Sequence, residues 1–342
     1  LLESVFSGQE GVDRPSDGGH DYAALLGGWM GMIDDDVPVT DIVMPGSHDS
    51  GTYGMLFLGE TQSLSFGDQM RSGASYFDVR IRRTGEGELR FYHGILTSEN
   101  GYGDFLSDTV RFLEENPTEF LILDYQHRDP AGDREFDNTL FSMLLDALGE
   151  ERILCAPDGM SDLDYVDSLT LGEARGKVLV TFGADARSTD YDFVMVRDSD
   201  GGTRAGSVLH SPYDEGNNVQ SEEYVNRVFG EYIAQYSAYG GGICVLQTQL
   251  LAGNDNGFVP QSMEEIHAPN VTAWIKSCKD DPDLLGGLNV IMRDYLTPRK
   301  CIDIIELNKY KNFVAEEHAS AFDALGAADD DIADAIVTDG DL

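Results

Sequence analysis

The sequence predicts an α/β fold, a single TIM-type (β/α) barrel that is distorted or incomplete. Strand-like and helix-like segments alternate from Asp41 to Tyr310, which favours a parallel α/β fold. The run at 119–127 is almost continuously apolar, as is typical of a parallel strand that is buried on both faces. No G-x-G-x-x-G or Walker loop occurs, which counts against the Rossmann and P-loop folds.

The first strand, 41–46, is apolar and ends at Pro45 and Gly46. The segment 75–82 alternates between apolar and polar residues, and 89–94 follows it after a Gly-rich turn, which indicates a hairpin. The further strands that we expect are 119–127, 177–183, 242–250 and 288–296. The helices that we expect are 105–117, 136–148, 225–236, 271–278 and 298–310. The chain therefore divides into an irregular N-terminal arm (1–30), a barrel (31–314) and an acidic C-terminal tail (315–342).

The composition excludes some classes of partner. The 342 residues include 62 acidic and 23 basic side chains, so that the formal net charge is −39. Binding of nucleic acid needs a basic surface, and electrostatic adsorption to anionic lipid needs one too. The acidity indicates either an ordinary solvated surface or adaptation to high salt.

The four cysteines are Cys155, Cys244, Cys278 and Cys301. None of them forms a C-x-x-C pair, which counts against a zinc site. Two disulfides or four buried free thiols both remain possible.

Polar side chains gather where the expected strands end. In a barrel of this type the C-terminal ends of the strands surround the active site, so we expect these side chains to converge. They are His48, Asp49, Asp78, Arg80, His93, Asp124, Gln126, His127 and Asp294.

Two histidines, several carboxylates and an arginine suit displacement at phosphorus. One imidazole accepts a proton and the other donates one, and a neighbouring carboxylate orients each ring. The arginine offers a planar fork for a phosphate. Each residue also has a structural interpretation, such as an Asx turn at Asp49 or an Asp78–Arg80 ion pair. The other histidines have no such neighbours, and we expect no catalytic role for them; they are His20, His210, His267 and His318.

Six segments in order resemble the bacterial phosphatidylinositol-specific phospholipases C, the catalytic X domain of the phospholipase C group. The resemblance covers about residues 40 to 310. The segments are MPGSHDSGT (44–52), QSLSFGDQMRSGASYFDVRIR (62–82), YHG (92–94), EFLILDYQH (119–127), LGEARGKVLV (171–180) and VIMRDYL (290–296).

The resemblance implies a role for five residues. His48 is the general base that activates the inositol 2-hydroxyl, and Asp294 supports it. His93 is the general acid that protonates the departing diacylglycerol oxygen, with Asp49 as its partner. Arg80 stabilises the charge that develops on the phosphate.

The substrate-binding residues depart from the family. The family has a lysine near Gln126 and His127, and its arginine after the fourth strand aligns with Gly183 and is replaced by Arg187. The substrate-binding set that we expect is Asp78, Gln126, His127, Arg187 and Tyr224.

No metal or cofactor is expected. The calcium-dependent relatives carry ligands at three positions that hold Asp49, Arg80 and Gln126 here, and a guanidinium cannot coordinate a metal ion. An ion bound by Asp78 and Asp124 remains an alternative.

The implied function is cleavage of phosphatidylinositol, or of a glycosyl-phosphatidylinositol anchor, to inositol 1,2-cyclic phosphate and diacylglycerol. A metal-dependent enzyme similar to the glycerophosphodiesterases and a non-catalytic inositol- or glycan-binding module are the alternatives. The partner would be a phosphoinositide lipid at a membrane surface, contacted through Phe57 and Leu58 unless these belong to the core. We expect a monomer that is secreted or at the cell surface; the given sequence contains no targeting segment.

Overall fold

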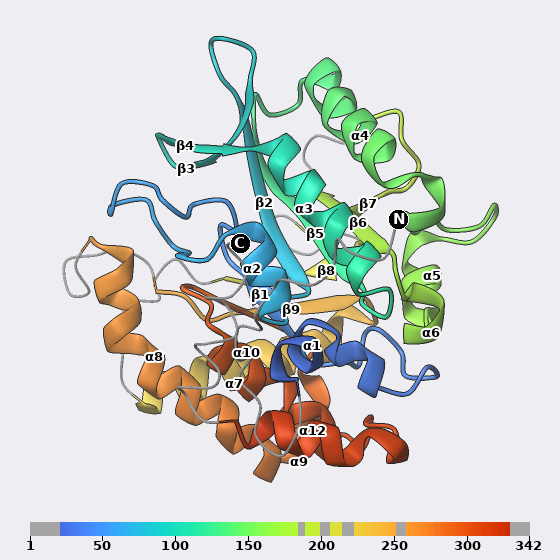
Figure 1. Cartoon of the computed structure of the whole chain (residues 1–342), viewed down its shortest axis with the longest axis vertical. Coiled ribbons are helices and arrows are strands. Elements are labelled where there is room, and N and C mark those ends of the chain that lie inside the picture. Colours follow the sequence, from blue (N-terminus) through green and yellow to red (C-terminus); the bar gives the residue numbers. More distant parts are fainter. Residues whose placement is uncertain (1–20, 184–188, 199–205, 214–221, 251–257, 329–342) are drawn as a thin grey trace, which may run out of the picture.

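The computed structural model describes residues 21–183, 189–198, 206–213, 222–250 and 258–328, and the statements below concern these residues (Figure 1). No helix in this part of the chain is long and apolar enough to cross a membrane.

Eight parallel strands form a closed barrel, which confirms the predicted fold class. The strands follow one another around the ring in the order β1-β10-β9-β8-β7-β6-β5-β2, and β2 pairs with β1 to close it. Their bounds are β1 (Met44–Ser47), β2 (Tyr76–Arg83), β5 (Leu121–Asp129), β6 (Val178–Gly183), β7 (Val194–Arg197), β8 (Leu209–His210), β9 (Ile243–Gln247) and β10 (Val290–Arg293).

The barrel is irregular where a strand is very short or where neighbouring strands pair over few residues. β8 has two residues, and β1 and β2 share only two register pairs. Gly46 lies at this closure: a Cβ built there would lie 2.9 Å from Val290 Cγ1 of β10 and 3.0 Å from Tyr76 Cδ1 of β2. A larger residue would therefore push β1 away from both of its neighbours.

A hairpin extends the barrel beside β2, as the sequence predicts. β3 (Leu89–His93) pairs with β2 in antiparallel fashion, and β4 (Leu96–Gly101) pairs with β3. The turn between β3 and β4 follows His93 directly, so the position of His93 depends on the hairpin rather than on the barrel.

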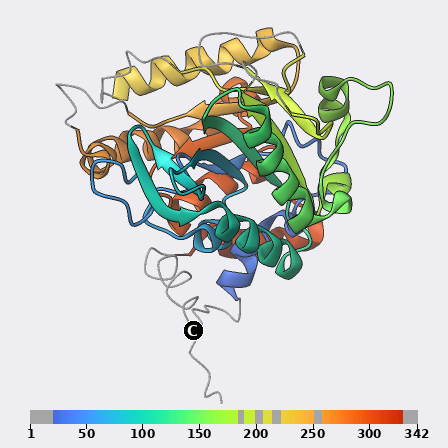
Figure 2. The ribbon, with the colours of Figure 1, turned by 90° about the horizontal axis from the view of Figure 1, so that it is seen from above.

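Helices surround the ring; Figure 2 shows α7 along one side and α3 along another. Between β6 and β8 the described residues contain no helix, so the alternation is incomplete there. The helices are α1 (Tyr22–Gly27), η1 (Trp29–Met32), α2 (Phe66–Arg71), α3 (Tyr102–Glu115), α4 (Arg134–Leu148), η2 (Glu150–Arg152), α5 (Asp162–Ser168), α6 (Leu171–Ala174), α7 (Glu222–Tyr239), α8 (Pro260–Ser277), η4 (Cys278–Asp280), α9 (Pro282–Gly287), α10 (Pro298–Ile305), α11 (Leu307–Tyr310), η5 (Glu316–His318) and α12 (Ala319–Gly326).

The helices pack on the barrel through their apolar faces. In α3, Phe105, Leu106 and Phe112 are buried at helical spacing. They belong to a large cluster that fills the space around β2, β5 and β6. A second cluster joins β9 and β10 to α7, α8 and α10.

The packed structure extends beyond the predicted barrel limits at both ends. Within the predicted arm, residues 1–20 lie outside the described residues, but α1 and η1 are folded and Trp29 is fully buried. Within the predicted tail, α12 buries Phe322 and Leu325 against the core, and 329–342 lie outside the described residues. The helix α12 contacts α1, η1 and α10, so the two ends of the described chain pack on each other.

All four cysteines are free thiols. Cys278 and Cys301 are buried, Cys244 is half-buried and Cys155 is exposed.

Candidate active site

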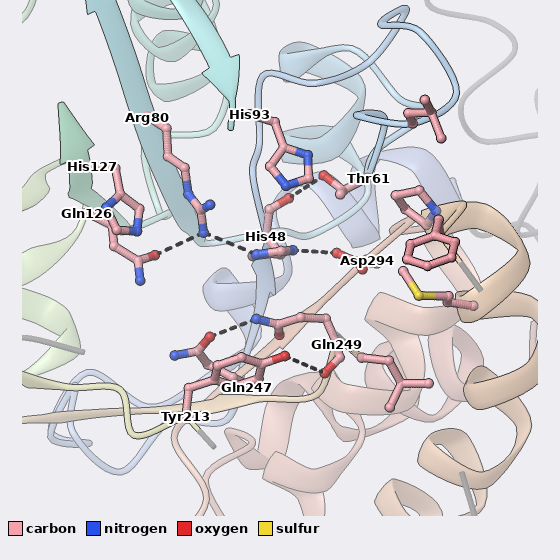
Figure 3. Close-up of a pocket in the computed structure, with 15 residues that line it drawn as sticks. His48, Thr61, Arg80, His93, Gln126, His127, Tyr213, Gln247, Gln249 and Asp294 are labelled. Carbon is pink, nitrogen blue, oxygen red and sulfur yellow. Dashed lines mark hydrogen bonds and ion pairs between the residues drawn. The ribbon is translucent and has the colours of Figure 1, made fainter. Parts of the chain in front are cut away.

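The ends of β1, β2, β3 and β10 bring four of the five predicted catalytic side chains together in one cavity, and Asp49 is buried beside them (Figure 3). The cavity has a volume of about 310 Å³. Among the described residues its lining is His48, Leu58, Thr61, Arg80, His93, Gln126, His127, Tyr213, Gln247, Gln249, Leu250, Phe258, Pro260, Met263 and Asp294.

His48 lies between two carboxylates. Its Nδ1 lies 2.6 Å from Asp294 Oδ1, so that Nδ1 carries the proton and the ring is oriented. When Nε2 is unprotonated it accepts a hydrogen bond from Arg80 Nη2 at 3.2 Å. When Nε2 is protonated it faces Asp49 Oδ2 at 3.4 Å. The ring therefore has a partner in both protonation states, as a general base requires.

Arg80 lies at the centre of the site. Its Nε is 2.6 Å from Asp49 Oδ1, and its Nη2 donates to Asp78 Oδ2 at 2.8 Å. A longer hydrogen bond of 3.4 Å connects Nη2 to Gln126 Oε1. Two fully buried carboxylates thus hold one guanidinium, which leaves it rigid and pre-oriented.

His93, at the end of the hairpin strand β3, faces the carboxylate of Asp49. Its Nε2 lies 3.6 Å from Asp49 Oδ2, and its Nδ1 bonds to the carbonyl oxygen of Gly59 at 3.0 Å. The side chain is 31 % exposed, whereas that of His48 is 12 % exposed. Asp49 therefore lies between the two histidines, and His93 is the one closer to solvent.

The electrostatics of the site follow from these contacts. Burial lowers the pKa of His48, but Asp49 and Asp294 outweigh this effect and raise the pKa to about 9. Burial opposes ionisation of Asp78, yet Arg80 and His48 lower its pKa to about 2. Burial raises the pKa of Asp294, and the adjacent His48 works against that rise.

Two residues beside the His48–Asp294 pair have an unusual backbone. Asp49 has a φ of 45° and Tyr295 a φ of 44°, where residues with side chains rarely occur. Such conformations cost about 1–3 kcal/mol each and persist only where the surroundings hold them. Gln62 is one such support, since its Nε2 donates to the carbonyl oxygens of His48 and Arg293. Sequence reasoning noted Gln62 only as part of a motif and gave it no role.

The predicted substrate-binding residues fall in different places. Gln126 and His127 line the cavity, whereas Asp78 is fully buried beneath Arg80. Arg187 lies outside the described residues. Tyr224 lies on α7, packed against the second cluster and under Arg227 at 5.4 Å, and is not part of the described cavity lining.

Tyr213 is the tyrosine that lines the cavity, so the placement of Tyr224 there was wrong. Tyr213 follows β8, a strand of two residues that has too short an apolar pattern to be found in the sequence. Tyr224 instead has the helical spacing of α7, which turns it toward the outer core.

Sequence reasoning also missed a pair of glutamines. Gln249 Nε2 donates to Gln247 Oε1 at 2.7 Å, and Gln247 Nε2 donates to the carbonyl oxygen of Ser211 at 3.0 Å. Both glutamines lie within the predicted strand 242–250, near its C-terminal end. The strand-end rule that selected His48 and Arg80 would have selected them too.

Among the described residues, one group could supply ligands to a metal ion: the ligand atoms of His48, Asp49 and Asp78 lie within 4.8 Å of one another. The guanidinium of Arg80 contacts all three, at 3.2, 2.6 and 2.8 Å. It lies where an ion would lie and already supplies the positive charge, so the arrangement does not fit a resident cation.

The carboxylate of Asp124 is engaged by three neighbouring side chains. It accepts hydrogen bonds from Tyr76 Oη at 2.7 Å and from Thr181 Oγ1 at 2.8 Å, and it pairs with Arg197 at 3.1 Å. These are buried side chains of β2, β6 and β7. These contacts count against the alternative of an ion bound by Asp78 and Asp124.

Comparison with known proteins agrees with the resemblance seen in the sequence. No family model matches the chain. A 1-phosphatidylinositol phosphodiesterase of Staphylococcus aureus (strain Newman) is 32 % identical over 100 residues, which is 28 % of this chain and 32 % of the relative. The mouse PI-PLC X domain-containing protein 2 is 27 % identical over 323 residues, which is 82 % of this chain and 87 % of the relative.

The fold is that of a solved phospholipase. The phosphatidylinositol-specific phospholipase C of Listeria monocytogenes superposes with a TM-score of 0.64 at 18 % identity, over 83 % of this chain and 98 % of that one. The aligned segment spans about a third of the length of the first bacterial relatives. The resemblance to this group is confirmed, while the activity of the chain is a matter for proposal.

Proposed function

We propose that the protein cleaves phosphatidylinositol, or a glycosyl-phosphatidylinositol, to inositol 1,2-cyclic phosphate and diacylglycerol. One observation supports this most strongly: His48 and His93 face a single Asp49–Arg80 ion pair from two elements of the fold. A phosphate held by Arg80 between the two rings would have a proton acceptor on one side and a proton donor on the other. The names of the bacterial relatives agree with this substrate.

The reaction follows from the Nε2 atoms of the two histidines, which both lie near Asp49. Nδ1 of His48 is engaged by Asp294, so Nε2 accepts the proton of the inositol 2-hydroxyl. The resulting alkoxide attacks phosphorus, and the bond between phosphorus and the diacylglycerol oxygen breaks. His93 gives its Nε2 proton to that oxygen, while its Nδ1 is held by Gly59. Because the hydroxyl is tethered beside the phosphate, its effective concentration is very high.

Arg80 provides the charge that the reaction needs. As the hydroxyl attacks, negative charge builds up on the non-bridging oxygens of the phosphate. A guanidinium that is already fixed by Asp49 and Asp78 stabilises this charge without having to reorganise.

The mouth of the cavity is apolar, which suits a lipid substrate. Leu56, Phe57 and Leu58 are 69 %, 63 % and 51 % exposed, so the alternative that Phe57 and Leu58 belong to the core is wrong. Leu58 also lines the cavity, as does Phe258, which is 63 % exposed. We propose that these side chains enter the surface of a bilayer, because the charge of −39 leaves apolar contact as the attractive force. The monomeric state and the location outside the cell stay predictions.

Product analysis tests the proposal. The protein is incubated with phosphatidylinositol vesicles in the presence of a chelator, and the products are followed by ³¹P NMR. Inositol 1,2-cyclic phosphate should appear first and inositol 1-phosphate later. Inactivation by the chelator would favour the metal-dependent alternative. Absence of turnover combined with binding would favour the non-catalytic module, and direct release of inositol 1-phosphate would contradict the cyclic step.

A further inference from the structure

The turn after β10 has to hold Asp294 with precision. The carboxylate of Asp294 lies 2.6 Å from His48 Nδ1, yet the next residue, Tyr295, has a φ of 44°. One side of the turn is held by the loop at residues 60–61. Tyr295 N donates to the carbonyl oxygen of Thr61 at 2.6 Å, and Tyr295 Oη donates to that of Glu60 at 2.5 Å.

Lys300 holds the other side of this turn. The residue lies in the first turn of α10, and its Nζ donates to the carbonyl oxygens of Asp294 at 3.0 Å and Tyr295 at 2.7 Å. A third hydrogen bond, of 2.7 Å, goes to Glu264 Oε1. An ammonium group has three N–H donors, so these three oxygens use all of them. Lys300 is therefore an internal support with no donor left for a substrate.

Glu264 anchors the ammonium to a neighbouring helix. It lies on α8, is 7 % exposed, and also accepts a hydrogen bond from Arg293 Nη2 at 3.1 Å. Arg293 is the last residue of β10 and is 1 % exposed. Since Pro260 and Met263 of α8 line the cavity, this buried group connects the cavity wall to the turn that carries Asp294.

We propose that Lys300 is a positioning residue, which fixes the direction of the Asp294 carboxylate and so the orientation of the His48 imidazole. The proposal rests on the proposed function only in that it treats the His48–Asp294 pair as catalytic. Lys300 touches neither the cavity nor the reacting atoms, and it acts through two backbone carbonyls.

Lys311, which follows α11, offers a control at the other end of β10. Its Nζ donates to the carbonyl oxygens of Asp41 at 2.6 Å and Leu288 at 3.0 Å. Leu288 precedes β10 and Asp41 precedes β1, so Lys311 holds one carbonyl at the end of β10 opposite to Asp294 and one before the neighbouring strand. Lys300→Met and Lys311→Met thus remove the same kind of support from the two ends of one strand.

The experiment compares the wild type, Lys300→Met and Lys311→Met by three measurements. The first is the low-field proton NMR resonance of His48 Nδ1–H, assigned by its loss in His48→Gln. The second is kcat and KM on a water-soluble inositol phosphodiester, and the third is the melting temperature. Lys300→Met should shift or lose the resonance and lower kcat by up to about 100-fold, the size of effect that a misplacement of 1 Å produces. KM should stay within about twofold of the wild-type value, because the change affects the transition state alone.

Lys311→Met should lower the melting temperature while keeping both the resonance and kcat. A Lys300→Met protein that keeps the resonance and kcat would overturn the proposal. If Lys300→Met does not fold, Lys300→Arg tests the same point, since a planar fork cannot present three donors from one nitrogen. If the wild type turns over no inositol phosphodiester, the proposed function fails, and the NMR comparison still decides whether Lys300 positions the pair.

Discussion

Asp294 lies 246 positions after His48 in the sequence, yet its Oδ1 lies 2.6 Å from His48 Nδ1. A general base must be unprotonated to act, whereas the negative charge of Asp294 favours the protonated form of His48. Burial lowers the pKa of His48, but Asp49 and Asp294 bring it to about 9. We expect kcat/KM for a soluble inositol phosphodiester to rise about tenfold per pH unit up to about pH 9.

The Asp294→Asn variant removes one of the two carboxylates that raise this pKa. The pKa of His48 should fall, so the rising limb of the pH profile should move to lower pH, while the plateau falls because the ring is oriented less well. Profiles of kcat/KM against pH for both proteins check this. Coincident rising limbs would show that Asp294 does not set the pKa of His48.

The guanidinium of Arg80 contacts two carboxylates: Nε forms an ion pair with Asp49, and Nε and Nη2 both donate hydrogen bonds to Asp78. An ammonium cannot reproduce this planar geometry, so Arg80→Lys should lower kcat by about 10²–10³-fold, as for the loss of one transition-state donor. Arg90→Lys, at an exposed pair with Glu88, is the matched control and should leave kcat unchanged. Equal activity in the two variants would show that the mechanism does not depend on the guanidinium of Arg80.

At the scale of elements, the loop between β1 and α2 combines two tasks. It carries Gly59, whose carbonyl accepts a hydrogen bond from His93, and it exposes Phe57 and Leu58, of which Leu58 lines the cavity. Replacing Phe57 and Leu58 by Ser removes apolar surface that would otherwise enter the bilayer. Activity on vesicles should fall, while activity on a soluble substrate should stay.

Met160 is an apolar residue that is also exposed, at 45 %, but it does not line the cavity, so Met160→Ser serves as the control. Vesicle co-sedimentation and the two activities are measured for each variant. A loss on vesicles and soluble substrate alike would mean that the two side chains support the loop instead of binding lipid.

At the scale of the whole molecule, the charge of −39 opposes the compact state by self-repulsion. Salt screens charges beyond a Debye length of about 10 Å at 0.1 M and about 3 Å at 1 M. If the acidity is an adaptation to high salt, the melting temperature should rise steeply between about 0.1 M and 1 M NaCl. Sucrose at equal osmolality separates screening from solute exclusion. A flat response to NaCl would favour an ordinary acidic surface and leave the proposed enzyme unaffected.

Much of the site could be predicted because parallel strands end at a common edge. His48 follows an apolar strand, Arg80 and Gln126 lie near the C-terminal ends of two further predicted strands, and the three lie together in the structure. The hairpin that carries His93 could be predicted as well, since its turn is rich in glycine.

The sequence by itself determined the class of barrel, the strand ends and the chemical set of two histidines, an arginine and carboxylates. Only the tertiary structure decided which strand-end groups face the cavity. Asp78 and Asp124 are register partners on neighbouring strands, yet Asp78 bonds to Arg80 at the site and Asp124 to Tyr76 and Thr181. The physical reason is that closing the barrel fixes the level and the direction of each side chain, and these depend on pairings with strands that are distant in the sequence.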